Sequence, residues 1–325
     1  MQDIDTLHLL LPRTLIKVVH DTVYIHDTVY VETDCGGEDD TPSAGIGVFS
    51  VSADKQVTFS KGNLQYHPAN NKWRFAENQS DYIGYANSNI AADYDGWIDL
   101  FGWGTGDAPT KSSTSYSDYS TFVDWGSNKI GGDAPNTWRT LTNDEWEYLL
   151  YTRTNANDLV GVAQVNGVNG LILLPDNWVC PSDITFKSGF HSSYGVDYYA
   201  TYQTFTVEQW SKLEAASAVF LPAAGNRGGT DVHFVQYYGR YWSATEYNSY
   251  YAYYFFFDSF EAGMSSNVRY DGHPVRLVKD IEGGGATPDT PDTPDTPTEP
   301  EEPTNPSAGI GTFSVSADKQ VTFSK

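Results

Sequence analysis

Three aspartates that lie close together in residues 93–99 are the first candidates for metal chemistry. Asp93, Asp95 and Asp99 stand in the segment DYDGWID. Carboxylate oxygens are the ligands that Ca²⁺ prefers, but this spacing does not complete an EF-hand loop. We expect a solvated acidic turn here, with a structural calcium ion as the alternative, and no other cofactor.

The two cysteines and the paired histidines offer little further chemistry. Cys35 and Cys180 are too few for a disulfide framework or a Cys-rich metal site. Cys180 lies next to Pro181 and close to a tryptophan, so we expect a packed small hydrophobic residue rather than a nucleophile. His20 and His26 each begin a copy of the repeat HDTVY, and no Cys or further His accompanies them. We interpret them as part of a stalk, not as zinc ligands, and predict no metal site.

Neither a phosphate loop nor a catalytic pair is evident. The segment 102–106, GWGTG, lacks the lysine and the helix pattern that follow a phosphate-binding loop, so it predicts a tight glycine turn. Glu145 is explained as a helix cap, three residues after Thr142. We therefore predict no catalytic residue.

The most informative segment is 237–260, which is dominated by Tyr and Phe. A tyrosine presents a large contact surface with only two side-chain torsions to order on binding. Segments rich in Tyr, Ser, Asn and Gly are typical of adaptable recognition surfaces. This segment predicts a binding surface.

Composition sets limits on the possible partners. The chain has 325 residues, 39% of them hydrophobic and 15% aromatic, which fits one domain of about 200 to 250 residues plus tails. Its formal net charge of −23 should repel nucleic acid and anionic membranes. The N-terminal residues lack a basic region followed by an apolar run, and no segment is apolar enough to span a membrane. We expect no signal peptide and no direct membrane insertion.

An internal repeat defines the domain organisation. Residues 43–61 recur as residues 307–325 with one change, Val48 to Thr312. This repeat predicts a tandem duplication in which the chain stops just inside the second copy, a lone terminal strand being the alternative. We expect an N-terminal stalk (1–42), a first domain (43–280), a Thr/Pro/Asp/Glu linker (281–306) and the start of a truncated second copy (307–325).

Local patterns predict an α+β fold. Apolar residues alternate on both sides of 53–56, which is a hairpin pattern. Capping boxes, Thr142 with Glu145 and Thr206 with Gln209, predict two helices. Short antiparallel strands are expected at 218–221, 241–244, 251–257 and 274–278.

Strand parity separates the aromatic residues of 251–257 into two faces. Side chains at every second position share a face. The face that carries an acid predicts Tyr254, Phe256 and Asp258 to be exposed, whereas Phe255 and Phe257 are expected in the core.

A series of motifs resembles the bacterial major-paralogous-domain family, which is related to the formylglycine-generating-enzyme (sulfatase-modifying-factor) fold. The motifs are LFGWG at 100–104, WRTLTNDEW at 138–146, FLPAAGNR at 220–227, YWSATE at 241–246 and VRLV at 275–278. The resemblance covers nearly all of 43–280 and implies a C-type-lectin-type fold. That type of enzyme needs a cysteine pair late in the domain, and no cysteine follows Cys180. The Glu-Pro-Asn, Gln-Pro-Asp and Trp-Asn-Asp motifs of calcium-dependent sugar binding do not occur either.

The same terminal segment resembles the variable proteins of diversity-generating retroelements, in which a reverse transcriptase randomises Asn codons. Such codons yield Tyr, Asp, Ser, His, Phe, Val and Asn. From this resemblance and the tyrosine content we predict these ligand-binding residues: Asp231, His233, Tyr237, Tyr238, Arg240, Tyr247, Asn248, Tyr250, Tyr251, Tyr254, Phe256, Asp258, Asn267, Tyr270, Asp271 and His273.

These observations favour a non-enzymatic recognition module, an adhesin or receptor-binding domain, at a cell surface, outside the cell or on a phage particle. Its expected partner is a protein or glycan on another cell, phage or host surface. The alternatives are a structural repeat of a surface filament and, less favoured, an oxidase of the formylglycine-generating type that lacks its cysteine pair.

Overall fold

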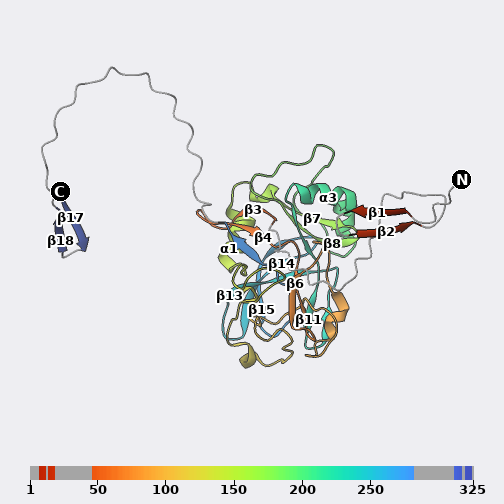
Figure 1. Cartoon of the computed structure of the whole chain (residues 1–325), viewed down its shortest axis with the longest axis horizontal. Helices are drawn as coiled ribbons and strands as arrows, with labels where there is room; N and C mark the ends of the chain where they lie inside the picture. The colour runs from red at the N-terminus through yellow and green to blue at the C-terminus, as the bar shows by residue number, and fades with distance from the viewer. Residues whose placement is uncertain (1–6, 12–13, 19–45, 282–310, 317–318, 324–325) are drawn as a thin grey trace, which may run out of the picture. The chain divides into compact units, whose positions relative to one another are not determined.

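The computed structural model describes residues 7–11, 14–18, 46–281, 311–316 and 319–323. Within them the chain is α+β, with few helices and many antiparallel strands, which confirms the predicted class (Figure 1). The chain divides into two compact units, Met1–Gly284 and Gly285–Lys325. The HDTVY repeat and almost all of the predicted linker lie outside the described residues.

Both predicted helix starts are confirmed. Thr142 and Glu145 form a complete capping box at the start of α1 (Asn143–Glu147), which continues as a π-helical turn (Tyr148–Thr152). Thr206 and Gln209 do the same for α3 (Val207–Ala215). In each box the threonine hydroxyl accepts from a backbone N–H of the first turn and the longer side chain accepts in return. The short α2 (Tyr198–Tyr202) has no side-chain cap, and no sequence signal predicted it.

A four-stranded sheet separates two hydrophobic clusters. Its order is β10 (Val219–Pro222), β8 (Val168–Leu173), β7 (Val160–Val165) and β9 (Thr204–Phe205). Only the β7–β9 pairing is parallel. Side chains alternate between the faces, so Leu171 and Leu221 join one cluster while Ile172 and Phe220 join the other beneath α3.

The predicted hairpin at residues 49–59 is confirmed. Strands β3 (Ile46–Ser50) and β4 (Gln56–Phe59) pair with each other, and β4 pairs also with β16 (Val278–Asp280). The strand expected at 274–278 is wrong except for its last residue. Residues 274, 275 and 277 are buried, but their carbonyls accept from three separate segments at Trp242, Leu64 and Ser60, so no continuous ladder forms.

The sheet that matters most for function contains β13 (Gly239–Glu246), β14 (Tyr251–Phe257) and β15 (Ala262–Val268) in that order. On one face, Tyr241, Phe255 and Phe257 enter the cluster that contains Trp146 of α1. The Phe255 and Trp146 rings stack with centroids 4.7 Å apart. The predicted core positions of Phe255 and Phe257 are thus confirmed, both being fully buried.

The opposite face of this sheet is covered along part of its length by an aromatic cluster. Trp242, Ala252 and Tyr254 pack there with tryptophans from earlier in the chain, among them Trp73 of the strand at residues 72–75 and Trp103 of a connecting segment. The Trp103 indole donates to the backbone carbonyl of Ser243, and the Trp242 indole donates to that of Phe101. The segment 102–106 makes the predicted turn, in which Gly104 has φ +65°.

Four hairpins complete the described strands: β1 (Leu7–Leu11) with β2 (Thr14–Val18), β5 (Leu64–His67) with β6 (Lys72–Phe75), β11 (Asn226–Gly228) with β12 (Asp231–His233), and β17 (Gly311–Ser316) with β18 (Lys319–Phe323). The last belongs to the repeated segment and keeps the register of the first copy near the turn, since Phe313 pairs with Val321 as Phe49 pairs with Val57. In the described part of the chain, no helix combines the length and the hydropathy needed to cross a bilayer.

The two adjacent phenylalanines of β14 test this arrangement. Phe255→Ala removes a fully buried ring and should lower the free energy of unfolding by about 3–5 kcal/mol. Phe256→Ala removes a half-buried ring from the other face and should lower it by roughly 1 kcal/mol. Urea denaturation of both variants measures the difference. Equal losses would mean that the face assignment is wrong.

Candidate functional site

A cleft opens where the aromatic cluster stops covering the sheet. Two cross-strand rows cross this face: Arg240, Phe256 and Gly263 in one, and Trp242, Tyr254 and Ser265 in the next. The second row is largely covered, whereas Phe256 and Arg240 are only half-buried. The cleft has a volume of about 460 Å³ and is lined by Tyr238, Arg240, Tyr254, Phe256, Glu261, Ala262, Gly263, Met264 and Ser265.

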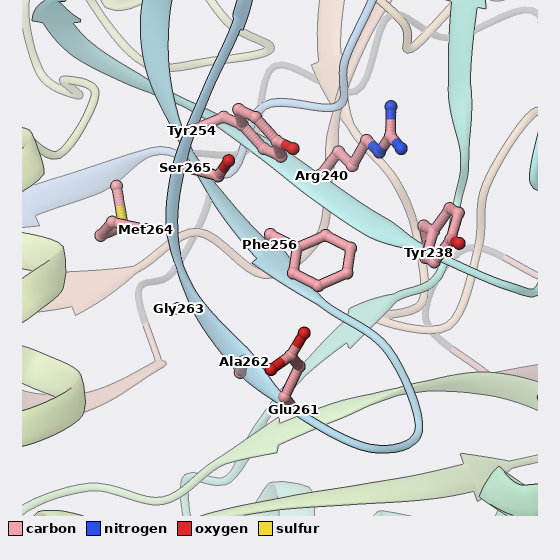
Figure 2. A pocket seen from close by; sticks show the side chains of 9 residues that line it. All are labelled: Tyr238, Arg240, Tyr254, Phe256, Glu261, Ala262, Gly263, Met264 and Ser265. Carbon is pink, nitrogen blue, oxygen red and sulfur yellow. The ribbon is translucent and has the colours of Figure 1, made fainter. Parts of the chain in front are cut away.

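The lining residues come from the three strands, from the turn between β14 and β15, and from Tyr238 just before β13. Figure 2 shows the Phe256 ring in the middle of the cleft, with Arg240 and Tyr238 on one side and Glu261 on the other. Four residues predicted from the sequence meet here: Tyr238, Arg240, Tyr254 and Phe256. Aromatic rings beside one cation and one carboxylate are the composition of a recognition site with few, well-placed polar groups.

The Arg240 guanidinium lies among aromatic rings. Its central carbon is 5.0 Å from the ring centroid of Tyr238, 5.4 Å from that of Phe234 and 5.9 Å from that of Tyr254. These distances fall within the range of cation–π attraction. The Tyr238 hydroxyl in turn lies 2.7 Å from the hydroxyl of Tyr194.

The loop that presents Phe234 and Tyr238 is strained and firmly anchored. Phe234 has φ +59° and Gln236 has φ +68°, a left-handed conformation that costs about 1–2 kcal/mol for a residue with a side chain. Gln236 offsets this cost through its hydrogen bonds. Its side chain accepts from the backbone N–H of Asn169 at 2.7 Å and donates to the Tyr82 hydroxyl at 2.7 Å. Strain held in place this way is common at binding sites.

A second group of tyrosines stands around the loop between β13 and β14. The Tyr116 ring lies 4.9 Å from that of Tyr250 and 5.3 Å from that of Tyr270. Arg269 holds the loop by donating to the carbonyl of Asn248 and forming an ion pair with Glu246 at 2.7 Å. Tyr250 therefore projects from a loop that Arg269 holds in place.

Of the predicted ligand residues, seven are exposed: Asp231, His233, Tyr237, Tyr247, Asn248, Tyr250 and Tyr251. Six are half-buried: Tyr238, Arg240, Phe256, Asn267, Tyr270 and Asp271. The remaining three, Tyr254, Asp258 and His273, are buried.

The predicted exposure of Tyr254 and Asp258 is wrong. Tyr254 is 7% exposed because Trp242 and His273 pack against its ring, and it reaches the cleft only at its edge. Asp258 is 6% exposed because its carboxylate accepts from the backbone N–H groups of Phe260 and Glu261 in the β14–β15 turn. Asp258 therefore marks the turn that follows the strand and does not indicate which strand face is exposed to solvent.

His273 is also corrected, from a ligand residue to a core residue. Its ring stacks on Trp242 with centroids 4.0 Å apart and is fully buried. The Asn267 amide nitrogen lies 3.1 Å from Nε2 and donates also to Asp271 at 2.8 Å. Burial, with a smaller contribution from the Arg240 charge, holds the pKa of His273 well below its usual value. The imidazole is therefore neutral at pH 7.

Two further expectations are corrected. Asp99 is buried rather than solvated, because its carboxylate accepts from the backbone N–H of Ile83 and from Asn87 at 2.7 Å, and burial raises its pKa to about 6. Cys180 is exposed instead of packed, with its thiol 3.4 Å from the carbonyl of Ile184. Among the described residues, no three His, Cys, Asp or Glu side chains stand together as a metal site would require.

Several site residues were missed in the sequence. Tyr116, at the start of a 3-10 helix, and Tyr194, in an irregular segment, lie far from 237–260 in the sequence, and nothing local signals that they contact Tyr250 and Tyr238. Glu261 and Ser265 could have been found from the sequence. They follow β14 after a short turn, in a segment of small residues that is compatible with a further antiparallel strand of the same sheet.

Comparison with protein families gives one match: a domain of unknown function (DUF8237) matches residues 198–278. This span includes β13, β14 and β15 together with every residue that lines the cleft. Comparisons with curated proteins and with solved structures found no match. The resemblance to C-type-lectin-type domains and to retroelement variable proteins stays a prediction.

The neutral, buried His273 predicts a pH effect on stability. Below about pH 6.5 the unfolded chain binds a proton at this histidine that the folded protein does not, so stability falls by up to about 1.4 kcal/mol per pH unit. The raised pKa of Asp99 has the opposite effect on stability below about pH 6. Because wild type and a His273 variant share this effect, it cancels in the difference between their stabilities. We expect the stability difference between wild type and His273→Gln to shrink as the pH falls from 7 to 5.

Urea denaturation at several pH values measures this difference. A constant offset between the two proteins over that range would show that His273 has the same pKa in the folded and the unfolded protein.

Proposed function

We propose that this chain is a non-enzymatic recognition module whose ligand surface is built from the tyrosines and the cleft of the β13–β14–β15 sheet. The observation that supports this most directly is the set of exposed rings, with Tyr247 and Tyr250 each 53% exposed. Fully hydrated aromatic surface is unfavourable, and several such rings close together are typical of interaction sites.

The geometry favours binding by a preformed surface. Tyr251 begins β14 and Phe256 stands five residues later on the opposite face, so one strand about 16 Å long carries an exposed ring on one side and the floor of the cleft on the other. Phe255, which lies between these positions, and Phe257, which follows them, anchor the strand in the core. Because the backbone is already ordered, little conformational entropy is lost on binding.

We place the domain at a cell surface, outside the cell or on a phage particle, with a protein or glycan as partner. The repeated segment 43–61 supports an array of domains. Linked copies raise the apparent affinity without new contacts when two of them can engage at once.

Removal of exposed rings tests the proposal. A double variant, Tyr250→Ser with Tyr251→Ser, should lose binding to a ligand found on a glycan array or a surface-protein library by at least about tenfold. Its melting temperature should change little, because both rings are exposed. Val207→Ser, at a 60% exposed position on α3, serves as the control.

A variant that unfolds instead would mean that the tyrosines are structural. Unchanged binding would place the ligand surface elsewhere.

We further propose that the exposed positions are diversified in the source population. The exposed predicted ligand residues are all Asp, His, Tyr or Asn, types that randomised Asn codons yield. Sequencing of codons 226–276 across that population should find variation at Asp231, His233, Tyr237, Tyr247, Asn248, Tyr250 and Tyr251, beside an adenine-rich template copy. Variation should be absent at Phe255 and Phe257, which the core requires. Equal variation at buried and exposed positions would contradict this.

A further inference from the structure

Arg240 differs from every other arginine in the described part of the chain, because no protein group accepts a hydrogen bond from it. Four of the others form ion pairs with carboxylates, namely Arg74, Arg139, Arg153 and Arg269. The fully buried Arg227 and Arg276 donate to carbonyl and amide oxygens. Arg240 makes neither kind of contact, and its Nε is buried without a partner.

An unpaired guanidinium at this position lowers the stability of the folded protein. A buried donor without an acceptor costs about 1–3 kcal/mol, and more when it belongs to a charged group, which here applies to the buried Nε of Arg240. The faces of the Phe234, Tyr238 and Tyr254 rings and the negative charge of Asp271 compensate part of the charge of Arg240. The rings cannot accept in the plane of the guanidinium, where its fork of N–H groups matches a carboxylate. The acceptor is therefore to be sought in a ligand.

Apart from the Tyr238 hydroxyl, which is bonded to that of Tyr194, the other polar side chains of the cleft also lack protein partners. The hydroxyls of Tyr254 and Ser265 and the carboxylate of Glu261 line the cleft and hydrogen-bond to no described side chain or backbone group. The Phe256 ring lies between Arg240 and Glu261 (Figure 2). A matching ligand has an acceptor at one end, a flat apolar surface in the middle and hydroxyl donors at the other end.

The charges favour a ligand with one negative group. Glu261 in the same cleft would repel a second anion close to it. The chain's net charge of −23 likewise disfavours a polyanion such as a nucleic acid or a strongly acidic peptide. A single carboxylate attached to a ring that bears hydroxyls meets both conditions.

We infer that the cleft binds an acidic sugar of the hexuronic-acid type, with its carboxylate on Arg240, the apolar face of its ring on Phe256 and its hydroxyls toward Glu261 and Ser265. This inference rests on the proposed recognition function and specifies the ligand chemistry of one part of its surface.

Isothermal titration of the full chain with methyl β-D-glucuronide and with methyl β-D-glucoside tests it. The two sugars differ only in the carboxylate. Wild type should bind the glucuronide at least about tenfold more tightly, the discrimination that a charge-assisted hydrogen bond provides. Arg240→Gln should abolish the preference. Arg240→Lys should keep part of it, because lysine retains the charge but not the fork.

Arg74→Gln is the matched control. Arg74 is half-exposed, lies over the Trp97 ring at 3.9 Å and is paired with Glu77, outside the cleft. This variant should bind both sugars as wild type does. Arg240→Gln should shift the melting temperature by no more than a few degrees, because it loses cation–π contacts but no protein hydrogen bond.

Equal binding of the two sugars by wild type, or a preference that survives Arg240→Gln, overturns the inference. Tighter, Arg240-dependent binding of inorganic phosphate or of a dipeptide with a free carboxyl end also overturns it and assigns the cleft to that chemistry. A ligand that requires Tyr250 and Tyr251 but not Arg240 would leave the recognition function standing while this inference fails.

Discussion

The structure depends on the β14 strand being packed on both faces. Its odd-numbered phenylalanines, Phe255 and Phe257, enter the core below, where Trp146 stacks on the first of them. Its even-numbered residues face the aromatic cluster, which covers Tyr254 and leaves Phe256 half-open. A shift of one residue in register would exchange the two faces. The same alternation therefore sets the core and the floor of the cleft.

Much of this fold could be predicted from local sequence. The capping boxes of α1 and α3, the β3–β4 hairpin and the bounds of β14 follow from rules that involve only neighbouring residues. The site was less accessible because it depends on distant contacts. Parity placed Tyr254 on the side opposite Phe255 correctly, but it could not reveal that tryptophans from residues 73–138 cover that side as well. A strand covered on both faces lacks the polar alternation on which the prediction relied.

The polar residues of the same region divide by a similar rule. Some of them form hydrogen bonds within the protein and so have a structural role: Asp258 caps a turn, and Asn267 connects Asp271 with His273. Sequence alone does not distinguish such residues from ligand-binding ones, because both are Asp, Asn or His in loops and at strand ends. Hydrogen bonding distinguishes them, and by that criterion Arg240 and Glu261 belong to a different group from Asp258 and His273.

The repeated hairpin has a consequence for how the chain reaches its native state. Strand β4 must pair with β16, and almost the whole domain separates Phe59 from Val278. The second copy of the same hairpin lies much nearer to β16 along the chain, and the shorter connection lowers the entropy lost on closure by roughly 1–2 kcal/mol. The chain thus encodes a competitor for its own first hairpin. During synthesis from the N-terminus, β3 and β4 are present when β16 emerges and the copy is not, so the order of translation favours the correct pairing, whereas refolding from denaturant exposes the domain to strand exchange.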